Sequence, residues 1–233
     1  MDRGKKVIAL REVLRERFPA AHRPVGERSG SSLVGGTGVP CLDSAGVGAG
    51  MVVEVAGIDG GGLVVWGLLE GAQACGRHVA LVDAADCFDP QDAGETACQG
   101  LLWVRCGGKN RVKEALRATD LLLRDGNIPL VLLDLQLCGH RELARIPGST
   151  WFRLRGLVER GGGLLVALTP SAQVGCADLR VSLDYHARVT DGDHLRKELL
   201  HPTTLQGYLT RHRGDSHGTV EGAEGAVPYQ KPA

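Results

Sequence analysis

The segment that decides the fold is Met51-Val-Val-Glu-Val-Ala-Gly-Ile-Asp-Gly-Gly-Gly62, followed by a helical stretch from Leu63 to Cys75. Its first half is short and rich in β-branched side chains, which predicts a strand. Its second half predicts a tight turn, because glycine tolerates backbone angles that other residues avoid. A second apolar run follows at 77–83. We therefore expect a strand, a glycine-rich turn, a helix and a second strand.

The glycine turn has the spacing of a phosphate-binding loop without its chemistry. Such a loop is spelled G-x-x-x-x-G-K-[ST]: backbone N–H groups face the phosphates, the lysine meets the outer phosphates and the hydroxyl residue holds Mg²⁺. Gly57 and Gly62 occupy the two glycine positions. Leu63 and Val64 stand where the lysine and the hydroxyl residue belong. The G-x-G-x-x-G pattern of dinucleotide-binding folds is not met after the first strand.

Composition and charge limit the classes of function. In the 233 residues, 27 Lys and Arg balance 27 Asp and Glu, which offers no global attraction to nucleic acid or to an anionic membrane. We expect a cytoplasmic protein without a membrane contact, because no signal sequence opens the chain and its apolar runs fall short of the ~20 residues that span a bilayer. Seven cysteines without a C-x-x-C pair indicate free thiols rather than a metal site.

Composition shifts along the chain predict four parts. Short apolar strands alternate with helices in the middle, which indicates an α/β fold with a mainly parallel sheet and helices on both faces. The alternating pattern at 179–185 favours an antiparallel extension near the C-terminus. Asp89 and Ser149 are expected to cap helices. The parts are an N-terminal amphipathic helix (1–19), a linker (20–37), the α/β domain (38–209) and a flexible tail (210–233); expected strands are 51–56, 77–83, 101–105, 130–135 and 164–168.

The N-terminal helix carries Leu10, Leu14 and Phe18 along one stripe. The Gly- and Ser-rich linker lets this helix reach a neighbouring molecule, so we predict the stripe as a partner-binding surface. A helix packed on its own core explains the same pattern. Both interpretations stay open at this point.

Several segments carry a family resemblance. Val53-Glu-Val-Ala-Gly57 resembles the strand that enters the RecA phosphate loop. Leu81-Val-Asp-Ala-Ala-Asp-Cys-Phe-Asp-Pro90 resembles the RecA segment with the catalytic glutamate, and Leu130 to Asp134 matches the Walker B strand. From about 38 to 189 the chain thus resembles a RecA-type recombinase core. The lead-in Thr37-Gly-Val-Pro-Cys-Leu-Asp43, the N-terminal helix and the small size resemble, more narrowly, the ImuA family of RecA-like accessory proteins.

The resemblance implies a RecA-like fold, and departures from the recombinase pattern argue against hydrolysis. Leu63, Val64 and Ala85 replace the lysine, the hydroxyl residue and the catalytic glutamate. Asp134 keeps the Walker B position, either as a hydrogen-bonded structural residue or as a weak metal ligand. We therefore expect a pseudo-ATPase without catalytic residues, cofactor or metal. Its degenerate nucleotide site comprises Gly57, Gly60, Gly61, Gly62, Leu63, Val64, Ala85 and Asp134.

The resemblance also places two DNA-binding loops after the fourth and fifth strands. The second loop, 170–178, is too short to line a filament axis. The first contains Arg141 and Arg145, which are the candidate DNA contacts; Arg153 and Arg155 on the next helix are expected on a solvated face. Without an aromatic stacking platform, weak or no direct DNA binding is expected.

For function, the ImuA resemblance implies a non-catalytic accessory protein in the SOS response, acting in DNA-damage-induced mutagenesis and translesion synthesis. The implied partners are RecA, docked through the N-terminal helix, or an ImuB-type polymerase-like protein held by 195–208 and the tail. The alternative is a divergent RecA-family NTPase or nucleotide-binding protein in recombinational repair, which would use the glycines and Asp134.

Overall fold

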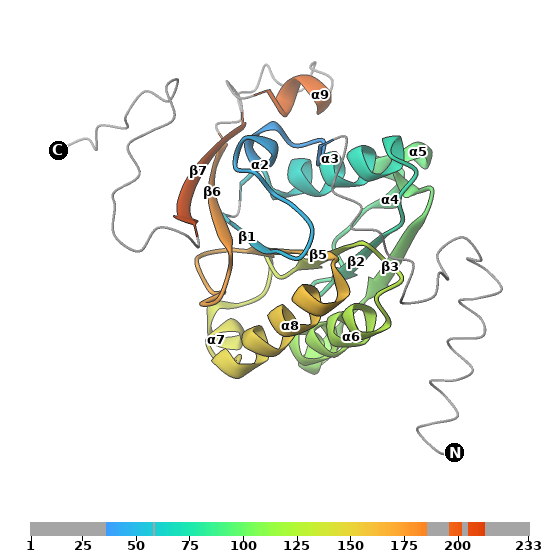
Figure 1. Cartoon of the computed structure of the whole chain (residues 1–233). Coiled ribbons are helices and arrows are strands. Elements are labelled where there is room, and N and C mark those ends of the chain that lie inside the picture. The colour runs from blue at the N-terminus through green and yellow to red at the C-terminus, as the bar shows by residue number, and fades with distance from the viewer. Residues whose placement is uncertain (1–35, 58, 186–195, 202–204, 213–233) are drawn as a thin grey trace, which may run out of the picture.

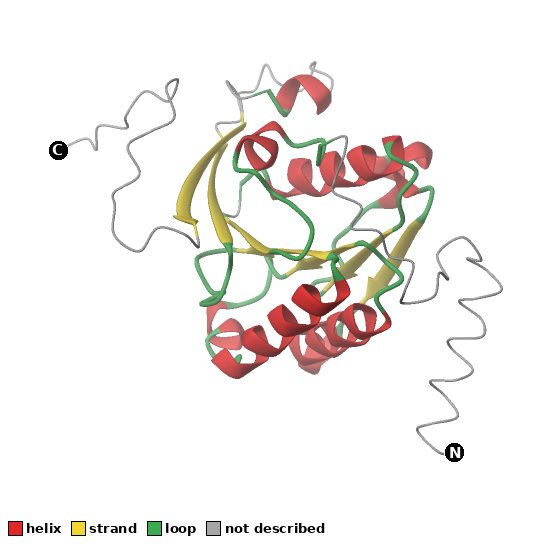
Figure 2. Cartoon of the chain, viewed as in Figure 1, coloured by secondary structure: helices red, strands yellow, loops and turns green. Residues whose placement is uncertain are grey.

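The computed structural model describes residues 36–57, 59–185, 196–201 and 205–212. Within them, one seven-stranded sheet lies between two layers of helices (Figures 1 and 2). None of the described helices is long and apolar enough to cross a bilayer. The elements are α2 (Pro40–Ser44), β1 (Val52–Ala56), α3 (Gly61–Ala74), β2 (Val79–Asp83), α4 (Pro90–Ala93), α5 (Glu95–Cys98), β3 (Leu101–Arg105), η2 (Gly108–Asn110), α6 (Arg111–Asp125), β4 (Leu130–Asp134), α7 (His140–Leu143), α8 (Gly148–Gly161), β5 (Leu164–Thr169), β6 (Leu179–Tyr185), α9 (Arg196–Leu199) and β7 (Leu205–His212).

The strands follow the order β3-β2-β4-β5-β1-β6-β7. Every neighbouring pair from β3 to β6 is parallel, and β7 runs antiparallel to β6. The expected α/β fold, mainly parallel with an antiparallel extension near the C-terminus, is confirmed. Because parallel strands end at the same edge of a sheet, the glycine turn after β1 and the ends of β2, β4 and β5 meet at one edge.

The direction of β6 differs from the expectation for 179–185. This strand pairs in parallel with β1, and only β7 runs the other way. The alternating pattern arises because Leu179 and Val181 are buried while their neighbours in the strand are half-buried. Alternation reports unequal burial of the two faces and carries no information about strand direction.

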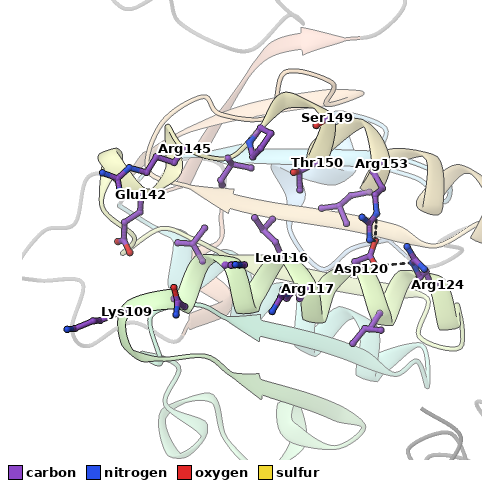
Figure 3. Close-up of a pocket in the computed structure, with 17 residues that line it drawn as sticks. Lys109, Leu116, Arg117, Asp120, Arg124, Glu142, Arg145, Ser149, Thr150 and Arg153 are labelled. Atoms are coloured by element: carbon purple, nitrogen blue, oxygen red, sulfur yellow. Dashed lines mark hydrogen bonds and ion pairs between the residues drawn. The ribbon is translucent and has the colours of Figure 1, made fainter. Parts of the chain in front are cut away.

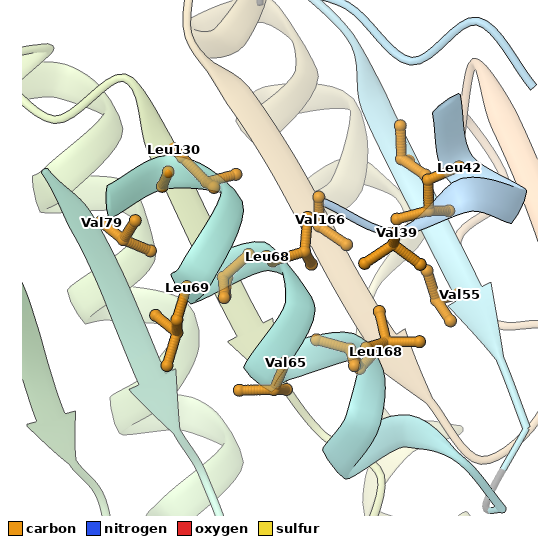
Figure 4. Close-up of a cluster of buried hydrophobic side chains, with 14 of the residues drawn as sticks. Val39, Leu42, Val55, Val65, Leu68, Leu69, Val79, Leu130, Val166 and Leu168 are labelled. Carbon is orange, nitrogen blue, oxygen red and sulfur yellow. The ribbon is translucent and has the colours of Figure 1, made fainter. Parts of the chain in front are cut away.

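Two apolar layers form the core, one on each face of the sheet. On one face α3 packs Leu68 and Leu69 against sheet residues such as Val166 (Figure 4). On the other face α6 and α8 cover the opposite side of the same strands, with Leu154 of α8 and Val131 of β4 in one cluster. The strands read as continuous apolar runs because helices bury both of their faces.

Helix ends are only partly as expected. Asp89 caps α4 and accepts hydrogen bonds from two first-turn N–H groups at 2.8 and 3.4 Å, as its Asp-Pro sequence predicts. The expected cap at Ser149 is wrong, because α8 begins at Gly148 after a proline and has no side-chain cap. At the C-terminal side, β7 continues to His212, so the expected domain boundary at 209 falls inside this strand.

A buried carboxylate joins the strands on one side of the sheet. Glu54, in the middle of β1, is fully buried, and its Oε2 accepts a hydrogen bond from Arg180 Nε of β6 at 2.5 Å. Its Oε1 accepts from the Thr169 hydroxyl at 2.9 Å and from the N–H groups of Gln173 and Val174 at 2.6 and 3.0 Å. One side chain thus connects β1, the end of β5, the loop after β5, and β6.

Glu54→Gln should lower the free energy of unfolding by about 3 kcal/mol, because it leaves the Arg180 guanidinium without its carboxylate in a buried site. The matched control is Glu159→Gln, which breaks an ion pair of an exposed carboxylate with Arg155 and should cost below about 1 kcal/mol. Urea denaturation of both variants measures the difference. Equal stability of the two variants would contradict a central role for Glu54.

Candidate functional site

The glycine-rich turn lies at the carboxyl edge of the sheet, between β1 and α3. Gly57 and Gly60 have φ of +143° and +81°, values that favour glycine. A Cβ at Gly60 would lie 2.7 Å from Leu205 Cδ1, so the turn also packs closely against β7. The Gly57 N–H donates to the carbonyl of Thr169 at 2.9 Å. The turn is therefore held by both β5 and β7.

Gln136, just past the end of β4, holds the turn from another side. Its Nε2 donates to the Gly57 carbonyl at 2.6 Å. A Cβ on Gly61 would lie 1.9 Å from Gln136 Oε1, so this glycine is required by the close approach of the amide. The sequence analysis missed Gln136. The available signal was a polar residue directly after an apolar strand and a Walker B-like aspartate.

The two positions where a phosphate loop has its lysine and hydroxyl residue are apolar and packed. Val64 is fully buried in the cluster on the α3 face, and Leu63 is half-buried against the same cluster. Gly62 is exposed, and nothing lies within 4 Å of a Cβ built on it. The first turn of α3 therefore presents backbone N–H groups, but these two side chains supply neither a charge for a phosphate nor an oxygen for Mg²⁺.

Two carboxylates lie side by side at the ends of neighbouring strands. Asp83 of β2 and Asp134 of β4 are opposite each other in register. Asp83 is fully buried and accepts hydrogen bonds from the N–H groups of Ala85 at 3.2 Å and Phe88 at 2.8 Å. Asp134 accepts one from the Gln136 N–H at 3.0 Å. Burial raises the pKa of Asp134 to about 6, and the charge of Asp83 adds to the rise.

The contacts of this carboxylate pair concern two expectations from the sequence, one for Ala85 and one for Asp134. Ala85 is half-buried beside Asp83 and contributes only its N–H, so the position matched to the catalytic glutamate has no acid of its own. Asp134 has the hydrogen bond that a structural residue requires. The sequence analysis did not select Asp83, although it ends an apolar strand as Asp134 does. Among the described residues, no group of three or more His, Cys, Asp or Glu is placed to hold a metal ion.

The loop after β5 is short and held at both ends. Glu54 accepts hydrogen bonds from the hydroxyl of Thr169, the last residue of β5, and from the N–H of Gln173 within the loop. At its far end Asp178 accepts from the Val52 N–H at 2.9 Å. These bonds are the reason that the loop lies against β1, and they agree with the expectation that it is no long DNA-binding loop.

The position of Arg155 differs from the expectation that it lies on a solvated face. Its side chain is only 11% exposed and lies between Asp178 at 2.8 Å and Glu159 at 3.0 Å, so it is not on a solvated face. Arg153, in contrast, is 58% exposed and pairs with Asp120 at 2.6 Å. The i, i+2 spacing on α8 turns the two arginines toward different surroundings.

Two further sets of residues were predicted to bind partners or DNA: the two arginines after β4 and the N-terminal apolar stripe. Arg141 in α7 and Arg145 just after it are both exposed. They lie in the short segment between β4 and α8, as the candidate first loop requires. Leu10, Leu14 and Phe18 of the predicted partner-binding stripe lie outside the described residues.

Comparisons with known proteins support the fold. The sequence matches no protein-family model and no curated protein. Among solved structures, the chain is similar to the crystal structure of the RadB recombinase, with a TM-score of 0.55 and 18% sequence identity over 77% of this chain and 90% of that chain. Together with the strand order, this likeness shows a RecA-like α/β fold.

The pKa of Asp134 gives a pH-dependent prediction. Its folded value of about 6 lies above the ordinary 3.8, so the folded state binds this proton more tightly and loses stability as the pH rises from about 4 to 6. Asp134→Asn keeps an acceptor for the Gln136 N–H. It should therefore raise the free energy of unfolding by about 1 to 3 kcal/mol near neutral pH, and by less near pH 5.

Urea denaturation at several pH values measures this effect. The control is Glu114→Gln on α6, which removes an exposed carboxylate and should change stability by about 0.5 kcal/mol or less. A loss of stability in Asp134→Asn at neutral pH would show that the ionised carboxylate has a favourable partner.

Proposed function

We propose that this chain is a non-catalytic RecA-like accessory protein, similar to the ImuA family, that acts through protein–protein contacts in DNA-damage-induced mutagenesis and translesion synthesis. The observation that carries the proposal is the packing of Leu63 and Val64 into the core after a glycine turn on a RecA-like fold. Phosphoryl transfer depends on positioning and charge neutralisation by a lysine and a metal. With both removed, the domain keeps the shape of a recombinase protomer and offers its surface to partners.

The partners in this proposal are RecA and an ImuB-type polymerase-like protein. The N-terminal stripe of Leu10, Leu14 and Phe18 is the attachment for RecA, and 195–208 with the tail is the attachment for the polymerase-like protein. Direct DNA binding is weak or absent, because the loop after β5 is short and bound to Glu54, and because the chain has no net charge.

A divergent RecA-family NTPase is the second candidate. It is favoured by the two neighbouring carboxylates, Asp83 and Asp134, because carboxylate oxygens are the ligands that Mg²⁺ prefers. In that case the glycine turn would bind phosphates through backbone N–H groups alone. A nucleotide titration separates the two candidates.

The purified chain should neither bind ATP tightly nor hydrolyse it, because charge, metal ligand and catalytic carboxylate are missing together. The double change Leu63→Lys and Val64→Thr should not restore hydrolysis, since Ala85 still provides no carboxylate and such groups act as a unit. Fluorescent-nucleotide titration with Mg²⁺ and a phosphate-release assay measure binding and turnover. Turnover in the parent that disappears in Asp134→Ala would overturn this proposal in favour of the NTPase.

Leu14→Asp should abolish association with a RecA-type partner while the thermal unfolding of the core stays within a few degrees of the parent. Docking of a helix in a groove depends on a few buried anchors, each worth ~1 to 3 kcal/mol when truncated, so one charge in the stripe is enough to detach it. The control Leu14→Met keeps an apolar side chain of similar size and should keep binding. A pull-down with RecA and a thermal scan measure both quantities.

The opposite result has a clear meaning. If Leu14→Asp destabilises the core and binding survives in the folded fraction, the helix belongs to its own domain. The attachment site then lies toward the C-terminus.

A further inference from the structure

A groove of about 1440 Å³ lies between α6 and α8 (Figure 3). Its aliphatic lining comes from Val112 and Leu116 of α6, Leu154 of α8, and Ile146 and Pro147 ahead of α8. These side chains continue the core cluster on this face of the sheet toward the surface. The groove therefore offers an apolar floor between two helices, away from the glycine turn.

Leu121 extends this apolar surface to the wall of the groove. It lines the groove and is 55% exposed, one of three large apolar residues with such exposure in the described chain. A single exposed leucine is ordinary on a protein surface. One that adjoins an aliphatic floor adds to a continuous apolar patch, which is the kind of surface that marks an interaction site.

The rim of the groove is strongly basic although the whole chain is neutral. Asp120 is already paired, with Arg124 at 2.9 Å and Arg153 at 2.6 Å. Arg111, at the start of α6, pairs with Glu142 at 2.8 Å. Within the described chain, no carboxylate lies within ion-pair distance of the remaining cations on α6 and η2, which are Lys109, Lys113 and Arg117. The six cations that line the groove are Lys109, Lys113, Arg117, Arg124, Arg145 and Arg153, against Asp120 and Glu142.

The cations are spread along the groove rather than gathered at one point. Lys113 and Arg117 are four residues apart on α6 and therefore lie along one side of it, and Lys109 precedes them in η2. Figure 3 shows Lys109 and Arg145 toward one end of the groove, and Arg124 toward the other. At 1.5 Å per residue α6 is ~22 Å long, which matches a bound helix of about 15 residues.

We propose that this groove binds an amphipathic helix of a partner protein that carries acidic residues beside apolar anchors. The aliphatic floor and Leu121 would take the anchors, and the unpaired cations would meet the carboxylates on either side. This inference rests on the proposed role in protein–protein contacts and names a surface for it. A nucleic acid fits less well, because the described lining holds no aromatic ring for base stacking and Asp120 and Glu142 would face the phosphates.

The charge of the chain's own ends argues for an external partner. Residues 1–35 hold eight Lys and Arg against four Asp and Glu, so their net charge has the same sign as the rim. Residues 213–233 hold three Asp and Glu against two Lys and Arg, and their only large apolar residues are Val220, Val227 and Tyr229. Neither end combines a clear negative charge with a row of apolar anchors.

The test uses the full chain and a labelled peptide of about 15 residues, with Leu at helical i, i+3, i+4 and i+7 spacing and Glu at the flanking positions. Arg117→Glu and Leu121→Asp should each weaken binding by about tenfold in fluorescence anisotropy. Arg160→Glu, on an exposed residue of α8 outside the groove, is the matched control and should leave the affinity within about twofold. Circular dichroism and thermal unfolding check that all three variants are folded.

Three outcomes would overturn the proposal. One is equal peptide affinity in Arg117→Glu, Leu121→Asp and Arg160→Glu. Another is an oligo-dT probe that binds better than the peptide and loses affinity in the first two variants, because the groove would then be a nucleic-acid site. A third is a dimer of the parent that Leu121→Asp dissociates, because a second copy would then occupy the groove.

The groove and the proposed function can fail separately. Nucleotide turnover in the parent would refute the accessory role without changing the peptide titration. A flat peptide titration with a silent nucleotide site would refute the groove alone.

Discussion

The carboxylate of Glu54 is the constraint on which the edge of the sheet depends. A charge in the middle of a fully buried strand is costly unless partners surround it, and four partners from three other segments do so here. Arg180 brings β6 to β1, and β6 in turn pairs with β7. Because β7 carries Leu205 against Gly60, the shape of the glycine turn depends indirectly on the same carboxylate.

The turn also shows how a phosphate-loop geometry persists without phosphate chemistry. Two of its glycines are required by neighbours within the chain: Gly60 by Leu205, and Gly61 by the amide of Gln136. The hydrogen bond of Gln136 to the Gly57 carbonyl ties the loop to β4. Internal packing is thus sufficient to keep these glycines, so their presence alone is weak support for nucleotide binding.

Local patterns were enough to predict most of the sheet, and long-range contacts were what the sequence could not reveal. Apolar runs located β1 to β5, because burial on both faces leaves a continuous apolar pattern in β1, β2, β4 and β5, while the edge strand β3 is only partly buried. The cap at Asp89 was predictable because donor and acceptor are two or three residues apart. Glu54 and Arg180 are 126 residues apart, and neither segment contains a local sequence pattern that predicts their contact. The direction of β6 and the contact of Gln136 with the turn could not be predicted either, because both depend on partners far away in the sequence.

The net charge of a chain likewise gives no information about the local charge of one surface. Salt screens exposed charges beyond ~10 Å, which is shorter than the ~22 Å length of α6, so a partner at the groove meets its local charge and not the sum over the molecule. Some of the exposed acids lie far from the groove: Asp89, Asp92 and Glu95 are on α4 and α5 or at their start, in the helical layer on the other face of the sheet (Figure 1). A neutral composition predicts no global attraction to nucleic acid. Because six cations line the groove against two acids, that composition is compatible with a locally basic docking surface.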